Sequence, residues 1–520
     1  MPVSRLALLP ILAAVPGSLA AQRPAPFRVE EATIADIHGA FRAGALTCRQ
    51  LVATYLRRID AYDKNGPAIN AIVTVSGTAL ATADSLDRRF AREGLTGPLH
   101  CIPVIVKDNF ETKDLPTSAG SLALADWRPT RDATLVARVR AAGAIVIAKS
   151  NMAEWAFSPF ETVSSVLPGY THNPYALDRV TAGSSGGTAA AVASSFGAVG
   201  LGTDTGNSIR GPSAHQSLVG MRSTMGLTSR MGVVPLYLSQ DIAGPMTRTV
   251  ADNAAVFQVV AGEDAADPVT SAARGRARPQ YPDSLKRDGL RGARIGVLRV
   301  AYESPTLDAE VAQVFARAVS DLRTLGATVI DTVIVPRLDS IRRLQAGTNC
   351  APFKHDLETY LASVASENPP VRTIDDVLKS GKFHPTVQRR LEQARDVAGV
   401  PDESPGCQAR EAYRAALRVA VVEAMDALRL DALAYPTWSN PPRRIGDLNT
   451  PAGDNSQVFS PATGFPAITV PMGWTRGVLP AGLQLLGRPW SEGTLYRLAY
   501  AFEQGTHHRH APASVPPLDP

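Results

Sequence analysis

The stretch of sequence that decides the fold is TAGSSGGTAAAVASSFGAVGLGTDTGNSIR, residues 181–210. It contains two turns rich in glycine and serine, separated by a run of small residues and a short apolar segment. Small side chains let a helix pack closely on a sheet, and this alone explains the alanines at 189–193. The serines and glycines of the two turns need a different explanation.

Two common motifs fit these turns poorly. Residues 183–187, GSSGG, match a nucleophile elbow with Ser185 as the nucleophile. That elbow follows a buried strand, whereas residues 173–180 are polar and contain Pro174. The glycines within residues 197–202 have the wrong order for a dinucleotide-binding loop and lie inside a predicted strand. Both motifs are therefore disfavoured.

A third interpretation gives each turn its own role. Ser208 follows the Thr-Gly-Asn sequence of residues 205–207, just after the strand predicted at 198–203. A turn at this point can aim successive backbone N–H groups at one position, which is the geometry of an oxyanion hole. Ser184 lies in the other turn. The two serines are therefore candidates for one catalytic site.

Lys107 is the third candidate catalytic residue. It ends the apolar run at 102–106, and α/β sheets place their sites at the carboxyl ends of strands. Strand alternation turns Asp108 to the opposite face. Burial without that counter-charge lowers a lysine pKa from about 10.4, and a neutral lysine can act as a general base. A lone lysine here is more often a solvated edge residue, but the serine turns favour catalysis.

Together these motifs resemble the amidase signature family, whose members use a Ser–Ser–Lys triad. The family pattern is close to G-G-S-S-G-G-S followed by G-T-D-x-G-G-S-I-R, with an upstream K-D-N. The corresponding segments here are AGSSGGT at 182–188, GTDTGNSIR at 202–210 and VKDN at 106–109. The resemblance extends over about residues 29–509 and includes DIAGPMTRTVAD at 241–252.

The resemblance implies a role for each motif residue. Ser208 corresponds to the acyl nucleophile, Ser184 to the bridging serine that follows a cis peptide bond, and Lys107 to the terminal base. The oxyanion hole would consist of the backbone N–H groups of Thr205, Gly206, Asn207 and Ser208. Asp204 and Arg210 would brace this loop without touching the substrate. The family chemistry requires no metal and no cofactor.

The sequence departs from the family pattern at two places. Asn207 replaces the second glycine before the nucleophile, and residues 219–224 read VGMRST where the family has V-G-L-K-P-T. Asparagine tolerates unusual backbone angles better than most residues, so we expect the loop geometry to be kept. The Asn207 side chain is expected to narrow the pocket or to donate a hydrogen bond.

The implied activity is hydrolysis of the C–N bond of a carboxylic amide to an acid plus ammonia or an amine, through a serine acyl intermediate. Esters and carbamates remain alternative small-molecule substrates, because their acyl chemistry is the same. A transamidation subunit serving a tRNA-bound partner has the same fold, and a catalytically silent binding domain is a further alternative. Retention of all three triad residues argues against the silent domain.

The substrate pocket is harder to predict. The loop containing Met152, Trp155 and Phe157, together with Trp438, is expected either to line an apolar pocket or to belong to the core. The sequence favours neither outcome.

The pattern of segments predicts an α/β fold with helices layered on both sides of a large, mixed and mostly parallel central sheet. Buried apolar strands alternate with amphipathic helices. The strands are expected at 102–106, 144–148, 198–203, 294–300, 329–335, 431–435 and 467–470. One amidase signature domain is expected over residues 22–510, with a helical insertion at about 340–428 and a flexible tail at 511–520.

Composition restricts the functional class. Hydrophobic residues are 45% and charged residues 19% of the 520 residues, as in folded globular proteins. The 53 basic and 48 acidic residues leave a net charge of +5 without a basic run, which disfavours nucleic-acid binding. No later apolar stretch is long enough to predict a membrane span.

The N-terminus predicts export. Arg5 precedes a short apolar run at 6–15, and small residues near Ala20 and Gln22 offer a cleavage site, so residues 1–21 read as a signal peptide. The mature protein is then expected in the periplasm or outside the cell, where an even number of cysteines permits disulfides.

The chain has four cysteines, for which three pairings are possible. Cys350 and Cys407 bracket one polar helical segment and are the favoured pair. Cys48 and Cys101 are equally well explained as small buried hydrophobic residues.

Overall fold

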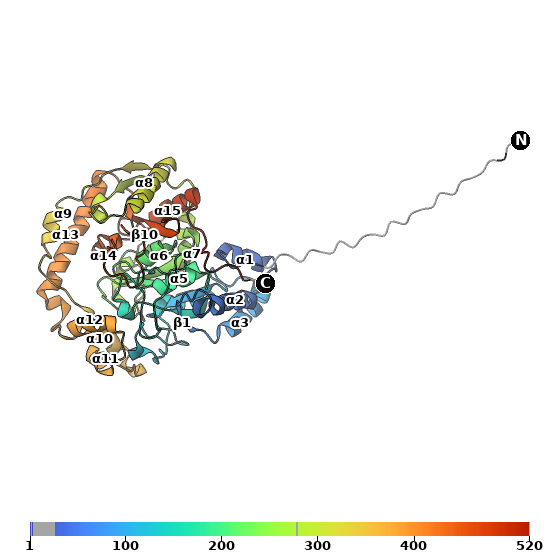
Figure 1. Ribbon diagram of the computed structural model, residues 1–520, viewed down its shortest axis with the longest axis horizontal. Coiled ribbons are helices and arrows are strands. Elements are labelled where there is room, and N and C mark those ends of the chain that lie inside the picture. The colour runs from blue at the N-terminus through green and yellow to red at the C-terminus, as the bar shows by residue number, and fades with distance from the viewer. Residues whose placement is uncertain (2, 4–26, 277–278, 519–520) are drawn as a thin grey trace.

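The computed structural model describes residues 1, 3, 27–276 and 279–518 (Figure 1). The predicted signal peptide therefore lies outside the described residues, apart from residues 1 and 3. Among the described helices, none combines the length and the apolar character that crossing a membrane requires.

One sheet forms the centre of the protein. Its strands are β1 (Ile72–Val75), β2 (Pro103–Lys107), β3 (Ile145–Ser150), β4 (Val199–Asp204), β5 (Val219–Arg222), β6 (Ile242–Thr247), β7 (Arg294–Val297), β8 (Thr328–Ile330), β9 (Ala432–Pro436), β10 (Ala467–Thr475) and β11 (Leu479–Leu486). Within the described residues these eleven strands are ordered β1-β3-β2-β4-β6-β5-β10-β11-β9-β7-β8. The prediction of a large mixed sheet in an α/β fold is confirmed.

The share of parallel pairs is smaller than expected. In the described part of the chain β2 pairs in parallel with β3 and β4, and β7 with β8 and β9. The other neighbours are antiparallel, including the β4–β6, β5–β6 and β10–β11 pairs. Parallel pairs need a crossover connection, but β10 and β11 are joined by a short turn and can only run antiparallel.

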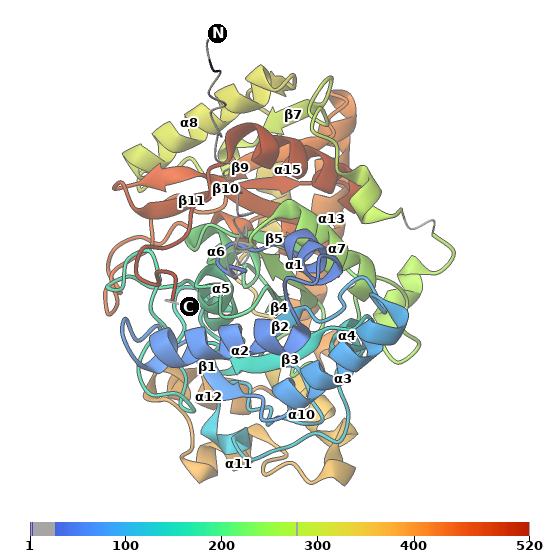
Figure 2. The ribbon, with the colours of Figure 1, turned by 90° about the vertical axis from the view of Figure 1, so that its right-hand side faces the viewer.

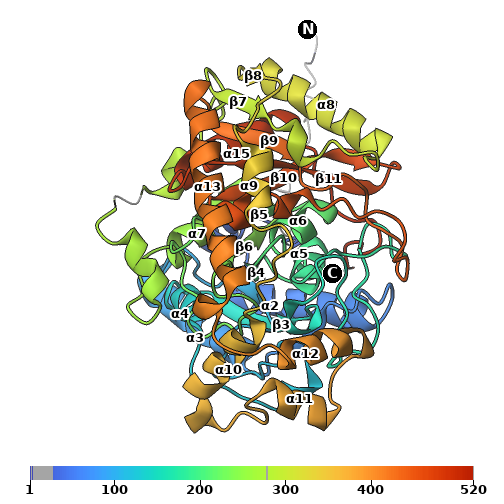
Figure 3. The ribbon, with the colours of Figure 1, turned by 90° about the vertical axis from the view of Figure 1, so that its left-hand side faces the viewer.

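Helices cover both sides of this sheet. They are α1 (Ile34–Arg42), α2 (Cys48–Ile59), α3 (Ala79–Glu93), α4 (Thr134–Ala141), α5 (Gly186–Ala193), α6 (Arg210–His215), α7 (Val250–Val260), α8 (Ala309–Thr324), α9 (Leu338–Arg343), α10 (Phe353–Ser363), α11 (Ile374–Ser380), α12 (Gln388–Arg395), α13 (Pro405–Ala427), α14 (Ser460–Thr463) and α15 (Glu492–Thr506). Figure 1 shows α9–α13 along one side of the molecule and α1–α3 on the opposite side. Figure 2 views the side that carries α1–α3, and Figure 3 views the side that carries α9–α13.

Two disulfides fasten this framework. Cys350 and Cys407 are bonded, as favoured from the sequence, and link the segment before α10 to the start of α13. Cys48 and Cys101 are also bonded, with Cα atoms 5.7 Å apart. The interpretation of the latter two as unpaired hydrophobic residues is therefore wrong, although both are buried. Their pairing depends on α2 packing beside the turn that precedes β2, which sequence spacing does not reveal.

The C-terminal segment differs from the flexible tail predicted at 511–520. In its described part, Val515 is buried, and the Arg58 guanidinium donates to the carbonyl oxygens of Val515 and Pro516, both at 2.9 Å. Arg58 is itself buried and needs these acceptors, because an unpaired buried charge is costly. The segment is therefore held against the body of the protein.

Candidate active site

The folded chain brings Lys107 and Ser184 into contact. Lys107 is the last residue of β2, and Ser184 lies in the turn before α5. The lysine Nζ donates to the Ser184 Oγ at 2.8 Å. The peptide bond between Gly183 and Ser184 is cis, as the resemblance implies. Ser208 follows β4 in the neighbouring loop and is 5% exposed, whereas Lys107 and Ser184 are fully buried.

Burial changes the acid–base chemistry of Lys107. Desolvation lowers its pKa from the usual 10.5 to about 7, although the negative charges of Asp241 and Asp204 oppose the shift. Asp108 does not neutralise this lysine. As strand alternation predicts, it points elsewhere, and its Oδ1 lies 3.1 Å from the Nζ of Lys149 on β3. Neutral Lys107 is therefore well populated at physiological pH.

Thr203 is a partner of Lys107 that the sequence analysis missed. Its Oγ1 accepts a hydrogen bond from the Lys107 Nζ at 2.7 Å and another from the Asn109 Nδ2 at 3.2 Å. These contacts fix the amine beside Ser184. The signal was present in the sequence, because Thr203 belongs to the GTDTGNSIR motif and Asn109 to the VKDN motif.

The loop at 205–208 presents free backbone donors. Among the described residues, the N–H groups of these four positions have no hydrogen-bond acceptor. The next two, those of Ile209 and Arg210, donate to the Asp204 carboxylate at 3.3 and 3.4 Å. Unpaired N–H groups beside a serine are the donors that an oxyanion hole requires.

The buried Asp204 carboxylate holds this loop in place. Its carboxylate pairs with the Arg210 Nε at 3.0 Å and with the Arg222 Nη1 at 2.9 Å, and all three side chains are fully buried. Burial raises the pKa of Asp204, but the two guanidinium groups outweigh it and lower the value to about 2. Arg222 is the arginine of VGMRST, where the family pattern has a lysine, so this departure keeps a cation in the brace and makes it a guanidinium group.

Asn207, the other departure, ties the loop to a neighbouring segment. Its Nδ2 donates to the Pro159 carbonyl at 3.1 Å, and its Oδ1 accepts from the Ser208 Oγ at 3.3 Å. The side chain therefore contacts Ser208, the predicted nucleophile, and it also donates a hydrogen bond, which is one of the two outcomes expected from the sequence.

A cavity of about 200 Å³ opens beside Ser208. Its walls combine the loop at 205–208 with apolar side chains and a few polar groups. The lining residues are Ala156, Phe157, Pro159, Thr205, Gly206, Asn207, Ser208, Leu236, Tyr237, Gln240, Arg390, Gln457 and Pro461. A cavity this small suits the acyl group of a small molecule or the end of a longer one.

The predicted pocket residues Met152, Trp155 and Trp438 do not line this cavity. Met152 and Trp155 are buried in the core, while Trp438 stacks on His215 with 4.4 Å between the ring centroids. Of the four apolar side chains considered, Phe157 alone reaches the cavity. Core and pocket aromatics have the same sequence pattern, because both alternate with small and polar residues.

Arg390 is a cavity residue that the sequence analysis missed. It comes from α12, in the helical segment between β8 and β9. Its Nη1 donates to the Phe157 carbonyl at 2.6 Å, and its Nη2 donates to the Tyr237 hydroxyl at 2.7 Å. No acidic side chain lies among the described cavity residues. The helical segment thus contributes to the pocket.

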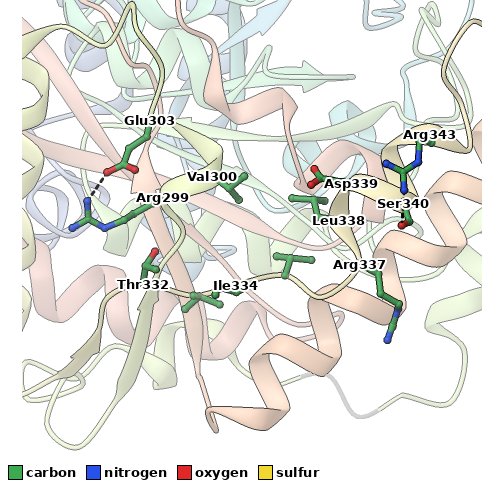
Figure 4. Close-up of a pocket in the computed structure, with 12 residues that line it drawn as sticks. Arg299, Val300, Glu303, Thr332, Ile334, Arg337, Leu338, Asp339, Ser340 and Arg343 are labelled. Atoms are coloured by element: carbon green, nitrogen blue, oxygen red, sulfur yellow. Dashed lines mark hydrogen bonds and ion pairs between the residues drawn. The ribbon is translucent and has the colours of Figure 1, made fainter.

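Size does not identify the site. A larger cavity, of about 870 Å³, lies between the β8–α9 connection and residues 299–303 (Figure 4). Its lining includes Val300, Ile334 and an Arg299–Glu303 ion pair, but none of the predicted catalytic residues. Nor do the described residues contain a cluster of His, Cys, Asp or Glu side chains suited to a metal ion.

Comparison with known proteins identifies the family of the chain. A sequence model of the family described as Amidase matches residues 50–496. The chain belongs to the amidase signature family. The crystal structure of native peptide amidase from Stenotrophomonas maltophilia is 37% identical to this amidase, with a TM-score of 0.84 over 93% of this chain and 98% of that one.

Two further relatives span almost the whole amidase. An amidase family protein from Bacillus anthracis is 30% identical, with a TM-score of 0.80 over 93% of this chain and 92% of its own. A glutamyl-tRNA(Gln) amidotransferase chain from Moorella thermoacetica is 35% identical over 90% of this chain and 95% of its own. The protein is therefore an amidase-family hydrolase with the fold of this family.

Proposed function

We propose that this amidase cleaves carboxylic amides to an acid plus ammonia or an amine through an acyl intermediate on Ser208. The observation that carries the proposal is the 2.8 Å contact between the fully buried Lys107 Nζ and the Ser184 Oγ. Ser208 lines a cavity together with the loop at 205–208. A desolvated lysine and a hydroxyl in contact form a proton relay that can activate a second hydroxyl.

In the proposed mechanism, neutral Lys107 accepts the Ser184 proton as Ser184 accepts the proton of Ser208. The Ser208 Oγ attacks the amide carbonyl, and the oxyanion is stabilised by the free N–H groups of the loop at 205–208. The relay then protonates the leaving nitrogen, and the C–N bond breaks. A water molecule, deprotonated by the same relay, hydrolyses the acyl enzyme. Esters and carbamates could enter the same relay.

The first test is covalent labelling, which requires no known substrate. A fluorophosphonate is expected to add once per chain, at Ser208, and the adduct is expected to disappear in Ser208→Ala. Intact mass followed by peptide mapping measures both. An adduct on Ser185 would support the elbow motif instead, and a folded protein without an adduct would contradict the proposal. Amides, peptide amides, esters and carbamates are then screened as substrates.

We further propose that the protein is exported after cleavage near Ala20–Gln22. Two disulfides that use all four cysteines support this, because such bonds persist in oxidising compartments and are rare in the cytosol. An exported location also disfavours a transamidation role on tRNA. Mass measurement of the protein from the periplasm or medium is expected to show the loss of residues 1–21, and an uncut cytosolic chain would contradict the proposal.

The disulfides are expected to stabilise the fold. The Cys350→Ala/Cys407→Ala double variant opens a link across 57 positions and is expected to unfold about 2–4 kcal/mol more easily in urea. The Cys48→Ala/Cys101→Ala double variant makes the same measurement for the second disulfide, which spans 53 positions. Equal stability of the first variant and the wild type under non-reducing conditions would contradict a stabilising role of the Cys350–Cys407 bond.

A further inference from the structure

Asp241 connects two walls of the active-site cavity. Its carboxylate is buried in the turn before β6. The Thr205 hydroxyl donates to the Oδ1 atom, while the backbone N–H groups of Leu236 and Tyr237 donate to the Oδ2 atom at 2.8 and 3.0 Å. All three donors belong to residues that line the cavity. One side chain therefore joins the oxyanion loop to the opposite wall.

A simple turn-capping role explains only part of this arrangement. Bonds to the N–H groups of Leu236 and Tyr237 are what an aspartate in a tight turn makes locally. The bond to Thr205 is different, because it spans 36 positions and reaches the first residue of the oxyanion loop. The turn does not need that contact, whereas the loop has few other side-chain links to its surroundings.

The negative charge of Asp241 is also unusual. Among the described residues it has no ion-pair partner. Arg230 pairs with Asp267 at 2.5 Å, and Arg222 pairs with Asp204. The charged groups around Asp241 are Arg222, Arg230, Asp204 and Lys107 on β2. Burial raises the pKa of Asp241 to about 6, and its charge raises the pKa of Lys107.

We propose that Asp241 is a positioning residue for the hydrolytic reaction. It holds Thr205 of the oxyanion loop against the Leu236–Tyr237 wall, and its negative charge adjusts the proton affinity of the Lys107 amine. This inference rests on the function proposed above. A buried carboxylate without a contacting cation has a free-energy cost that its three hydrogen bonds offset only in part. The cost is understandable if the carboxylate serves both the loop and the lysine.

Asp241→Asn removes the charge of the side chain and keeps its shape. Asparagine keeps the size and can still accept from the backbone N–H groups, but it carries no charge. The rate of fluorophosphonate reaction at Ser208 is expected to fall about 10- to 100-fold, because small displacements of catalytic groups are costly. The acidic limb of its pH profile, which Lys107 is expected to set near pH 7 in the wild type, is expected to move to lower pH, because the charge of Asp241 raises the pKa of Lys107.

Asp252 provides a matched control. It is also buried, its Oδ1 accepts from the Ile34 N–H at 3.0 Å, and burial likewise raises its pKa to about 6. It lies on α7 and is not a cavity residue. Asp252→Asn is expected to leave the labelling rate and its pH profile as in the wild type.

Thr205→Val tests the positioning role alone. It removes the hydroxyl that contacts Asp241 and leaves the charge, so the rate is expected to fall while the acidic limb stays near pH 7. Thr205→Ser is expected to restore the rate. A Thr205→Val variant that is labelled at the wild-type rate overturns the positioning role. This test does not depend on Asp241→Asn, so it decides the matter even if circular dichroism shows that Asp241→Asn does not fold.

The outcomes separate this inference from the function on which it rests. A wild-type enzyme that is not labelled at Ser208 overturns the proposed function, and the inference with it. A labelled wild type together with an Asp241→Asn variant whose acidic limb is unchanged overturns the electrostatic role of Asp241. A lower rate in that variant with an unchanged limb would then leave only a structural link through Thr205.

Discussion

Replacing Lys107 with methionine is expected to lower the rate of Ser208 acylation by about 10³-fold or more, because the relay then has no final proton acceptor. Methionine has a similar length and no charge, so it fits the buried site without desolvating an amine. Ser184 and Ser208 remain in place, and the oxyanion N–H groups are unchanged. The loss therefore measures the base itself. Fluorophosphonate labelling at Ser208, followed by mass spectrometry, gives the rate without a substrate.

Lys107→Arg is the matched variant. Arginine keeps the positive charge and its donors but cannot become neutral in a protein, so it is expected to be as inactive as methionine. The wild-type rate is expected to rise as the pH passes through about 7, where the buried lysine loses its proton. An arginine variant with wild-type turnover would falsify the role of Lys107 as the base. Circular dichroism establishes that each variant is folded.

The candidate catalytic motifs could be recognised in the sequence because each is local. GTDTGNSIR contains the proposed nucleophile, its proposed backbone donors and one arginine of the brace within nine positions. Lys107 stands out because it ends an apolar run at the end of a strand and because the two serine turns accompany it. Its lowered pKa followed from burial and from strand alternation at Asp108, and both are found in the structure.

The cavity walls could not be predicted, because they come from segments distant in sequence. Asp241 meets Thr205 across 36 positions, and Arg390 reaches the Phe157 carbonyl across 233. Nothing near Arg390 distinguishes it from the other charged residues of a helical surface. Trp155 and Trp438 show the opposite problem, since large apolar side chains are as common in a core as in a pocket.

Some strands also escaped prediction. β6 has the sequence IAGPMT, in which Gly244 and Pro245 are typical of turns, yet it pairs with both β4 and β5. Proline is tolerated here because close packing and the neighbouring strands impose the extended conformation, and tertiary contacts override local propensity. This strand leads from Asp241 into the sheet, so the missed strand and the missed positioning residue belong to one segment.

Replacing Asp204 with alanine is expected to destabilise the fold by about 3–5 kcal/mol, the largest stability change predicted for this chain. The variant leaves Arg210 and Arg222 buried with like charges and without their shared carboxylate. It also removes the acceptor for the N–H groups of Ile209 and Arg210, so the loop that bears Ser208 loses its brace. Urea unfolding of the wild type and the variant at pH 7 measures the difference.

The pH dependence of that difference identifies its cause. The folded-state pKa of Asp204 is about 2, below its usual 3.8, so the ionised carboxylate stabilises the fold fully above pH 3.8. This contribution is lost as the pH falls through about 2, because the protonated side chain no longer neutralises the arginines. The gap between wild type and Asp204→Ala should therefore narrow in acid. Asp204→Asn, which keeps the shape and loses the charge, should reproduce most of the gap at pH 7. A constant gap from pH 7 down to pH 2 would assign the loss to packing, because the charge of Asp204 would then make no contribution.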